Sequence, residues 1–340
     1  MSFFLLIAGM IRLSPHFSML LLGLCSCWMH SDLSAEDLAT PALTPVSFQA
    51  DWFSNAQFAG FFWADVGGIY AEHGLDFSFS PFAYGTDFLG DVGSGKVAFG
   101  TAEAYILIDA VGKGADLVAL GAVLVKSPAG YIYLKESGIE GAADLKGKRV
   151  GIHAYTDELF KFFVAAAGLP EGSVEPVKVQ HEIETLLDGS VDLHQGYAID
   201  EMLRLQSMTD QPVGTLLFED LGMPMYSMVI YSSRKYVEAH PEIAKAFVAA
   251  SAAGWERAMR APEIAALIVN GPYASEEVDA AMVPVQAKAL KPFVMKEGHR
   301  TLSMTKAKWA AMQKNYLETG MIKQAIDLDK FLEFATPDKP

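Results

Sequence analysis

The stretch of residues 46–79 constrains the fold more than any other part of the chain. Apolar and polar residues alternate over residues 46–51, which is the two-residue period of a β-strand. Apolar residues then recur with the spacing of an amphipathic helix, at Phe58, Phe61, Phe62, Val66 and Ile69. Gly74 is suited to a left-handed helix C-cap, and alternation returns over residues 75–79. This order predicts a βαβ unit with two parallel, neighbouring strands and a right-handed crossover.

The loop after the first strand carries three side chains that suit a binding site. Trp52 follows the strand directly, and Asn55 and Gln57 come shortly after it. In open parallel sheets, ligands bind at the carboxyl ends of the strands, where this loop would lie. Trp52 could instead be partly buried in the core, and Asn55 and Gln57 could simply cap the following helix. We expect all three to face a ligand.

Length and composition indicate a globular protein with two lobes. The chain has 340 residues, of which 51% are hydrophobic and 20% charged, so it can bury substantial cores. The formal net charge of −15 argues against nucleic acid as a partner, because phosphates need basic side chains. An acidic surface of this kind suits a soluble, diffusing protein.

The N-terminal residues predict an exported protein. Apolar runs over residues 3–10 and 17–24 are each shorter than the ~20 residues that span a bilayer. Arg12 ahead of the second run is typical of a signal peptide, which we place at residues 1–35 with cleavage after Ala35. Three alternatives remain open: translation from Met10, lipidation at Cys27, or an uncleaved anchor. Both cysteines, Cys25 and Cys27, lie in this leader, so the rest of the chain has neither disulfides nor thiolate sites.

Several further motifs carry a resemblance to a known family. They are Asp51-Trp52, Gln57-Phe58-Ala59-Gly60-Phe61-Phe62, Ile69-Tyr70-Ala71-Glu72-His73-Gly74-Leu75-Asp76, Gly93-Ser94-Gly95-Lys96-Val97-Ala98-Phe99-Gly100, Asp144-Leu145-Lys146-Gly147-Lys148-Arg149-Val150-Gly151 and His240-Pro241-Glu242. Over roughly residues 46–260 the chain resembles periplasmic solute-binding proteins of the thiamine-pyrimidine (formylaminopyrimidine) type. These are related to thiamine-pyrimidine synthases and to the nitrate, sulfonate and taurine binding proteins of ATP-driven importers.

The resemblance implies an α/β, type II periplasmic binding protein fold. Two α/β lobes would be joined by a two-segment hinge, with a ligand cleft between them. Residues 46–130 would begin lobe 1, residues 136–222 would form lobe 2, and residues 223–340 would return to lobe 1 and add C-terminal helices. The hinge segments would lie near residues 125–135 and 222–232.

Tyr197 and Glu201 are the strongest candidates for contacts with a ligand. Their spacing of four residues at a predicted helix start would place them on one helical face. From the spacing alone they could equally be surface residues. In pyrimidine-binding relatives, a Tyr and a Glu four apart after this strand hold the aminopyrimidine ring. The resemblance therefore implies that Tyr197 stacks on a planar ring, that Glu201 accepts hydrogen bonds from its edge, and that Trp52 forms a second wall.

Other polar and aromatic residues are expected near the same site. Glu103 begins a predicted helix, where it could face the cleft or merely complement the helix dipole. The further candidates on strand-end loops are Tyr84, His153 and Tyr155. Asp157 and Glu158 occupy the first turn of the next helix and make a strongly anionic ligand less favourable there.

The resemblance also covers an enzyme, the iron-dependent thiamine-pyrimidine synthase that uses its own histidine and pyridoxal phosphate. Its lysine and histidine after the Gly-Ser-Gly-Lys turn correspond here to Ala102 and Ile106. Its cysteine-rich run corresponds to Gly222-Met223-Pro224-Met225-Tyr226, which has no cysteine. Without the lysine no Schiff base can form, and without histidine and cysteine little remains to hold iron. We therefore expect a binding protein with no cofactor, no metal and no catalytic residues.

The resulting hypothesis is a monomeric, periplasmic substrate-binding component of an ABC importer. It would bind a small planar nitrogen heterocycle, such as a thiamine-precursor pyrimidine, and dock on an inner-membrane permease. A sulfonate, taurine or nitrate ligand is the first alternative. A sensory module that presents its ligand to a membrane receptor is another.

Overall fold

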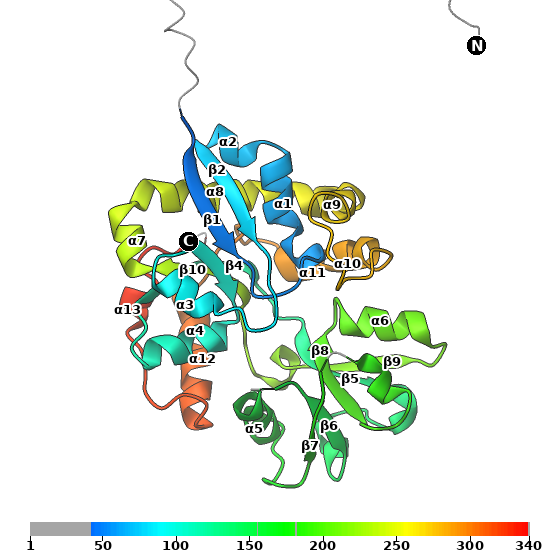
Figure 1. Ribbon diagram of the computed structural model, residues 1–340. Helices are drawn as coiled ribbons and strands as arrows, with labels where there is room; N and C mark the ends of the chain where they lie inside the picture. Colours follow the sequence, from blue (N-terminus) through cyan, green and yellow to red (C-terminus); the bar gives the residue numbers. More distant parts are fainter. Residues whose placement is uncertain (1–41, 155, 181, 339–340) are drawn as a thin grey trace, which may run out of the picture. The chain divides into compact units, whose positions relative to one another are not determined.

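Two five-stranded sheets with their helices form the part of the chain that the computed structural model describes, residues 42–154, 156–180 and 182–338 (Figure 1). The leader predicted at residues 1–35, including Cys27, lies outside these residues. Within them, every helix is too short or too polar to span a bilayer. The predicted α/β class with two lobes is confirmed.

The first sheet has the strand order β2-β1-β3-β10-β4. Its strands are β1 (Thr44–Gln49), β2 (Leu75–Ser80), β3 (Phe99–Ala102), β4 (Leu117–Leu124) and β10 (Ser227–Ser233). β1 pairs in parallel with β2, with Phe48 opposite Phe79, which confirms the predicted βαβ unit. β10 runs antiparallel to both β3 and β4. We call this sheet and its helices lobe 1.

The second sheet, lobe 2, repeats that arrangement in the order β7-β6-β8-β5-β9. Its strands are β5 (Ala129–Leu134), β6 (Arg149–Ile152), β7 (Glu175–Lys178), β8 (Leu193–Tyr197) and β9 (Val213–Leu217). Here β5 is the strand that runs antiparallel to its neighbours. The chain passes from β4 directly into β5, and from β9 back into β10. In each sheet, the strand arriving from the other lobe is therefore the antiparallel one.

Most of the helices belong to lobe 1. They are α1 (Ala59–Val66), α2 (Ile69–Glu72), α3 (Phe88–Gly93), α4 (Ala104–Gly112), α7 (Arg234–Ala239), α8 (Pro241–Arg260), α9 (Pro262–Val269), α10 (Val283–Ala289), α11 (Lys291–Val294), α12 (Lys306–Glu318) and α13 (Leu328–Phe331). Lobe 2 has α5 (Asp157–Ala166) and α6 (Glu201–Met208). Short 3₁₀ turns are η2 (Ala56–Phe58), η3 (Lys135–Ser137), η4 (Ala142–Leu145), η5 (Ile183–Leu186) and η6 (Glu219–Leu221).

The first predicted helix is interrupted, and this corrects part of the sequence interpretation. Gly68 adopts φ +72°, which separates α1 from α2, and Val66 at the end of α1 is 54% exposed. The buried face of α1 therefore ends before Val66, although the apolar spacing predicts that it includes this residue. Gly74 has φ +76°, in agreement with the left-handed C-cap predicted there.

Alternating residues of β5 pack against helices on opposite faces of the lobe 2 sheet. The ring of Tyr131 lies 4.4 Å from that of Phe163 in α5, whereas Ile132 belongs to a separate apolar cluster with Leu205 of α6. The α5 face continues into lobe 1, because Phe162 meets the ring of Tyr316 in α12 edge-on at 5.5 Å. The two lobes thus share one apolar core on this side.

The two segments that connect the lobes are hydrogen-bonded to each other and to α12. The hydroxyl oxygens of Ser127 and Ser227 lie 2.8 Å apart. Lys308 Nζ of α12 donates to the carbonyl oxygen of Val125 at 2.7 Å and to a carboxylate oxygen of Glu219 at 2.9 Å. Burial lowers the pKa of Lys308. Helix α12 therefore supports both crossing segments.

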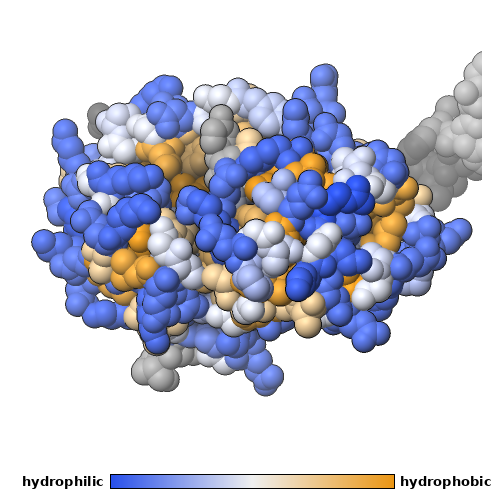
Figure 2. Space-filling model, turned by 90° about the horizontal axis from the view of Figure 1, so that it is seen from below, coloured by the Kyte–Doolittle hydropathy of each residue, from blue (hydrophilic) through white to orange (hydrophobic). Residues whose placement is uncertain are grey.

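Charged and polar side chains dominate the face of the molecule shown in Figure 2, with hydrophobic atoms visible between them. Many of the ion pairs in the described part of the chain, such as Lys245 with Glu242, have both side chains exposed and contribute little to stability.

Close helix packing in lobe 1 depends on glycine. A Cβ atom at Gly254 in α8 would lie 2.1 Å from the carbonyl oxygen of Gly60 in α1 and 2.8 Å from the Cβ of Ala64. A Cβ atom at Gly60 would in turn lie 2.2 Å from the ring of Trp255. The backbones of α1 and α8 can approach this closely only without side chains at the crossing.

We expect Gly254→Ala to lower the free energy of unfolding by about 1–3 kcal/mol, because the added methyl group forces the two helices apart. Urea unfolding monitored by circular dichroism measures the change. Gly112→Ala is the matched control, since a Cβ atom there would have its nearest contact at 3.8 Å and alanine favours a helix. Equal stability of the two variants would contradict the packing argument.

Candidate ligand-binding site

A cavity of about 1090 Å³ is lined by residues of both lobes. Its walls come from the loops that follow β1 and β2, the start of α4, the loop after β6, the end of β8 and the first turn of α6. The loops after β1, β2, β6 and β8 all follow strands that belong to the parallel part of a sheet. The cavity therefore lies where parallel sheets generally place ligands.

The cavity brings together most of the residues proposed from the sequence. Those that line it are Trp52, Gln57, Tyr84, Glu103, His153, Tyr197 and Glu201. Asn55 does not line the cavity, because its side chain caps η2 by accepting a hydrogen bond from Gln57 N–H at 2.8 Å. Tyr155 lies outside the described residues.

An aromatic cluster forms the lobe 1 wall of the cavity. The rings of Trp52 and Phe82 are stacked, with centroids 5.8 Å apart and planes inclined by 23°. Phe53 packs edge-on against both, at 5.6 and 5.3 Å, and Tyr84 is 5.5 Å from Phe53. Tyr84 is 66% exposed at the rim. The wall offers flat apolar surfaces to which a planar ligand can bind.

Tyr197 and Glu201 meet in lobe 2, but not on one helical face as the spacing suggested. Tyr197 is the last residue of β8, and Glu201 is the first of α6. They converge because Tyr197 N–H donates to Glu201 Oε2 at 2.7 Å. A Cβ atom at Gly196 would lie 2.8 Å from that of Glu201, so the residue before the strand end must be glycine for the Glu201 side chain to fit.

Glu201 is only 5% exposed, which changes the ionisation of its carboxyl group. Burial, with the neighbouring Asp200 as a smaller cause, raises the pKa of Glu201 well above its usual range. One of its oxygens already accepts the Tyr197 N–H group. The pair therefore provides a ring face and a buried acceptor side by side.

Glu103 occupies the middle of the site and touches both lobes. It accepts hydrogen bonds from the Tyr197 hydroxyl at 2.5 Å, the Ser227 hydroxyl at 2.7 Å and Met228 N–H at 3.4 Å. Although Glu103 is the N-cap residue of α4, its side chain makes no capping bond. Burial raises the pKa of Glu103 to about 7, against the lowering effect of the hydroxyl donors and with a further upward contribution from Asp51.

The sequence interpretation missed several residues that line the cavity. Asp51 directly precedes Trp52; it accepts a hydrogen bond from the Thr101 hydroxyl at 2.6 Å, and burial raises its pKa. Tyr105 lies in the first turn of α4, next to Glu103. Both positions border residues already proposed, so inspection of the neighbours at each strand end could have found them. Phe82 and Gln195 had no comparable local signal.

The charged lining of the cavity is mainly acidic. The carboxyl groups are those of Asp51, Glu103, Asp109, Glu158 and Glu201, and the basic side chains are Lys113, Lys323 and His153. Lys113 forms an ion pair with Asp109 at 2.6 Å. The described lining includes no arginine. This charge distribution favours a neutral or positively charged ligand over an anion.

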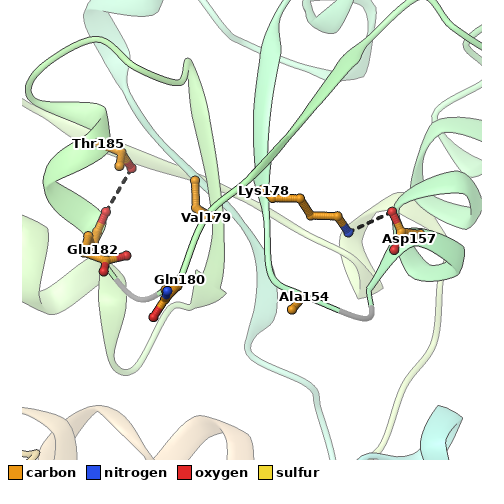
Figure 3. Close-up of a pocket in the computed structure, with 7 residues that line it drawn as sticks. All are labelled: Ala154, Asp157, Lys178, Val179, Gln180, Glu182 and Thr185. Carbon is orange, nitrogen blue, oxygen red and sulfur yellow. Dashed lines mark hydrogen bonds and ion pairs between the residues drawn. The ribbon is translucent and has the colours of Figure 1, made fainter.

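A second recess of about 760 Å³ lies in lobe 2 beside the cavity (Figure 3). Ala154, Val179 and Gln180 line both, so the recess is a lateral extension of the same space. Lys178 crosses it to form an ion pair with Asp157 at 2.8 Å. In the described parts of the chain, acidic, histidine and cysteine side chains nowhere form a group suited to a metal ion.

Comparisons with known proteins agree with this geometry. The structure superposes on the crystal structure of the periplasmic aliphatic sulphonate binding protein SsuA from Escherichia coli with a TM-score of 0.67 and 16% identity, covering 85% of this chain and 91% of that one. At this identity the likeness shows the fold alone, and it confirms the predicted periplasmic binding protein fold.

The names of two sequence relatives state different functions, one a binding protein and the other a synthase. The chain is 27% identical over 248 residues to the formylaminopyrimidine-binding protein of Halalkalibacterium halodurans, covering 72% of this chain and 73% of that protein. It is 24% identical over 222 residues to the 4-amino-5-hydroxymethyl-2-methylpyrimidine phosphate synthase of Legionella pneumophila, covering 64% and 70%. A family model described as NMT1/THI5 like matches residues 55–265, more than half of the sequence. The chain therefore belongs to the NMT1/THI5-like family.

Proposed function

We propose that this protein is the periplasmic substrate-binding component of an ATP-driven importer and that it binds a small planar nitrogen heterocycle, such as a thiamine-precursor pyrimidine. The observation that carries the proposal is the meeting, in one cavity, of the aromatic wall around Trp52 with the Tyr197–Glu201 pair of the other lobe. Export by residues 1–35, a permease partner and a monomeric state are parts of the same proposal.

The chemistry of the cavity matches an aminopyrimidine. The faces of such a ring are apolar and stack on aromatic side chains, whereas its edge carries N–H donors that a carboxylate accepts. Glu201 supplies a buried acceptor beside the Tyr197 ring. The name of the Halalkalibacterium halodurans relative, a formylaminopyrimidine-binding protein, supports the same ligand class.

A sulfonate or nitrate ligand fits the cavity less well. An anion would have to approach Asp51, Glu103 and Glu201, and the basic side chains among the described lining residues are Lys113, Lys323 and His153. The likeness to a sulphonate-binding protein concerns the fold and gives no evidence for its ligand here.

A synthase activity is the alternative that the Legionella pneumophila relative raises. The positions that the family resemblance assigns to a catalytic lysine and histidine hold Ala102, which is buried at the end of β3, and Ile106, which lines the cavity. Neither side chain can form a Schiff base or bind iron. We therefore propose binding without turnover, and product formation by the purified chain would refute it.

A thermal-shift screen of the purified protein against pyrimidines, thiamine, taurine and nitrate tests the ligand class. A bound ligand raises the melting temperature by an amount that grows with the ratio of its concentration to its dissociation constant. We expect stabilisation by an aminopyrimidine. Stabilisation by taurine or nitrate alone would contradict the proposal.

Glu201→Gln should weaken aminopyrimidine binding by roughly 10- to 100-fold, because the single oxygen of the amide accepts the Tyr197 N–H group and its NH2 group then faces the N–H donors of the ring edge. The new amide oxygen can still accept the Tyr197 N–H group, so folding should be preserved. Calorimetric titration measures the affinity, with Glu297→Gln, at an exposed site, as the matched control. Unchanged affinity in Glu201→Gln would exclude this residue as the ring contact.

Glu103 should make the stability of the unliganded protein depend on pH. Its pKa is about 7 in the folded protein and 4.5 ordinarily, so between these values the folded state holds a proton that the unfolded state has lost. The contribution of Glu103 to the free energy of unfolding therefore falls as the pH rises from about 4.5 to about 7. Glu103→Gln cannot ionise and should gain stability relative to the wild type between pH 5 and pH 8. Urea unfolding across this range measures the difference, and a constant difference would contradict the assignment.

A further inference from the structure

A second polar contact joins the lobes beside the cavity, through the residue that precedes Glu201. Asp200 is 8% exposed. Its Oδ2 accepts a hydrogen bond from Asn55 Nδ2 at 3.3 Å, and its Oδ1 accepts one from Gln286 Nε2 at 2.9 Å. Asn55 precedes η2 and Gln286 lies in α10, so both donors belong to lobe 1. One carboxylate of lobe 2 is thus held by two amides of lobe 1.

The orientation of both amides makes the contact specific for a carboxylate. The oxygen of Asn55 is already used as acceptor for Gln57 N–H, so the amide must present its nitrogen to Asp200. Gln286 is 4% exposed, and its Oε1 has no hydrogen-bond partner among the described residues. Leaving that oxygen unpaired has a cost, which the hydrogen bond from Nε2 to a charged oxygen offsets. If the Gln286 amide were rotated by 180°, its Oε1 would face Oδ1 of Asp200, and two acceptor oxygens would repel each other.

The contact also determines where the lobe 2 wall of the cavity lies. Asp200 N–H donates to the carbonyl oxygen of Tyr197 at 3.1 Å, and the Asp200 carbonyl accepts from Arg204 N–H at 2.9 Å. Asp200 is therefore part of both the turn after β8 and the first turn of α6. Asn55 stands three residues after Trp52 in the loop that follows β1. The hydrogen bond between Asn55 and Asp200 thus connects the loop of one wall to the turn of the other.

We propose that Asp200 is a positioning residue: its bridge to Asn55 and Gln286 holds the two lobes together and places the Tyr197–Glu201 pair relative to the Trp52 wall. The bridge lies outside the cavity and does not need a ligand. The effect of the bridge on ligand affinity rests on the proposed function. The effect of the bridge on the distance between the lobes does not depend on that function.

Gln286→Glu tests the bridge because it replaces a donor by a second carboxylate at nearly constant size. Adding Asp200→Asn should restore the bridge, since the amide nitrogen introduced at position 200 can donate to the carboxylate introduced at position 286. Its oxygen can still accept from Asn55 Nδ2. Gln286→Ala removes one donor without adding charge, and serves if Gln286→Glu does not fold. Gln211→Glu, at an exposed site in lobe 2, is the matched control.

The distance between the lobes can be measured by electron paramagnetic resonance on spin labels. The labels are placed on the full chain carrying Cys25→Ser and Cys27→Ser, at Asp76→Cys in β2 and Glu175→Cys in β7. Both sites are exposed and lie on edge strands, far in the strand order from the crossing strands β10 and β5. A rotation about the crossing segments moves such distant sites the most. The reference chain is the labelled chain without further substitutions. We expect one narrow distance distribution in this chain without ligand and in the Gln211→Glu control. Gln286→Glu and Gln286→Ala should shift or broaden it, and the double variant should restore it.

Calorimetric titration with the aminopyrimidine from the thermal-shift screen is the second arm. Gln286→Glu should bind at least about tenfold more weakly, with recovery in the double variant. A reference-like distance distribution in both folded single variants would overturn the proposal, as would a double variant that stays shifted. Failure of every pyrimidine to bind the reference chain would refute the proposed function but leave the distance result to decide the role of Asp200.

Discussion

The carboxylate of Glu103 is the point at which the two lobes meet in the cavity. It accepts hydrogen bonds from Tyr197 of β8 and from Ser227 and Met228 of the crossing strand β10. A buried carboxylate is costly unless its oxygens are hydrogen-bonded, and here lobe 2 supplies one of the donors. The hydrogen bond from the Tyr197 hydroxyl to Glu103 also fixes the orientation of the Tyr197 ring in the wall of the cavity. Separation of the lobes would expose this carboxylate and release that ring, so the integrity of the site and the arrangement of the lobes depend on one another.

The topology explains why residues distant in the sequence form one site. The chain enters lobe 2 from β4 and leaves it from β9, and the two crossing segments bond to each other through Ser127 and Ser227. Because both sheets present the ends of their parallel strands to the same cavity, residues near positions 52, 103 and 200 become neighbours. Lys308 of α12 contacts both crossing segments and Tyr316 of α12 packs against Phe162 of lobe 2, which gives α12 a role beyond covering lobe 1.

Local sequence patterns predicted the elements well and the contacts between them less well. The βαβ unit, the Gly74 cap and the start of α6 at Glu201 follow from periodicity and turn residues, which act over a few positions. Trp52 and Tyr197 could be proposed from their places at strand ends, aided by the family resemblance. The hydrogen bond between Tyr197 and Glu103 could not, because it spans 94 residues and depends on how the lobes pack. For the same reason local patterns place Asn55 at the ligand, whereas its side chain caps η2 and reaches Asp200, and they place Val66 on a buried face that ends before it.

The central claim is that a flat nitrogen heterocycle binds between the aromatic wall at Trp52 and the Tyr197–Glu201 pair. A crystal structure of the protein with an aminopyrimidine tests it most directly. The account predicts ring density in the cavity between the lobes, with a ring nitrogen or amino group within hydrogen-bonding distance of a Glu201 oxygen. Density for the ring only outside the cavity, or a ring whose edge faces away from Glu201, would contradict it.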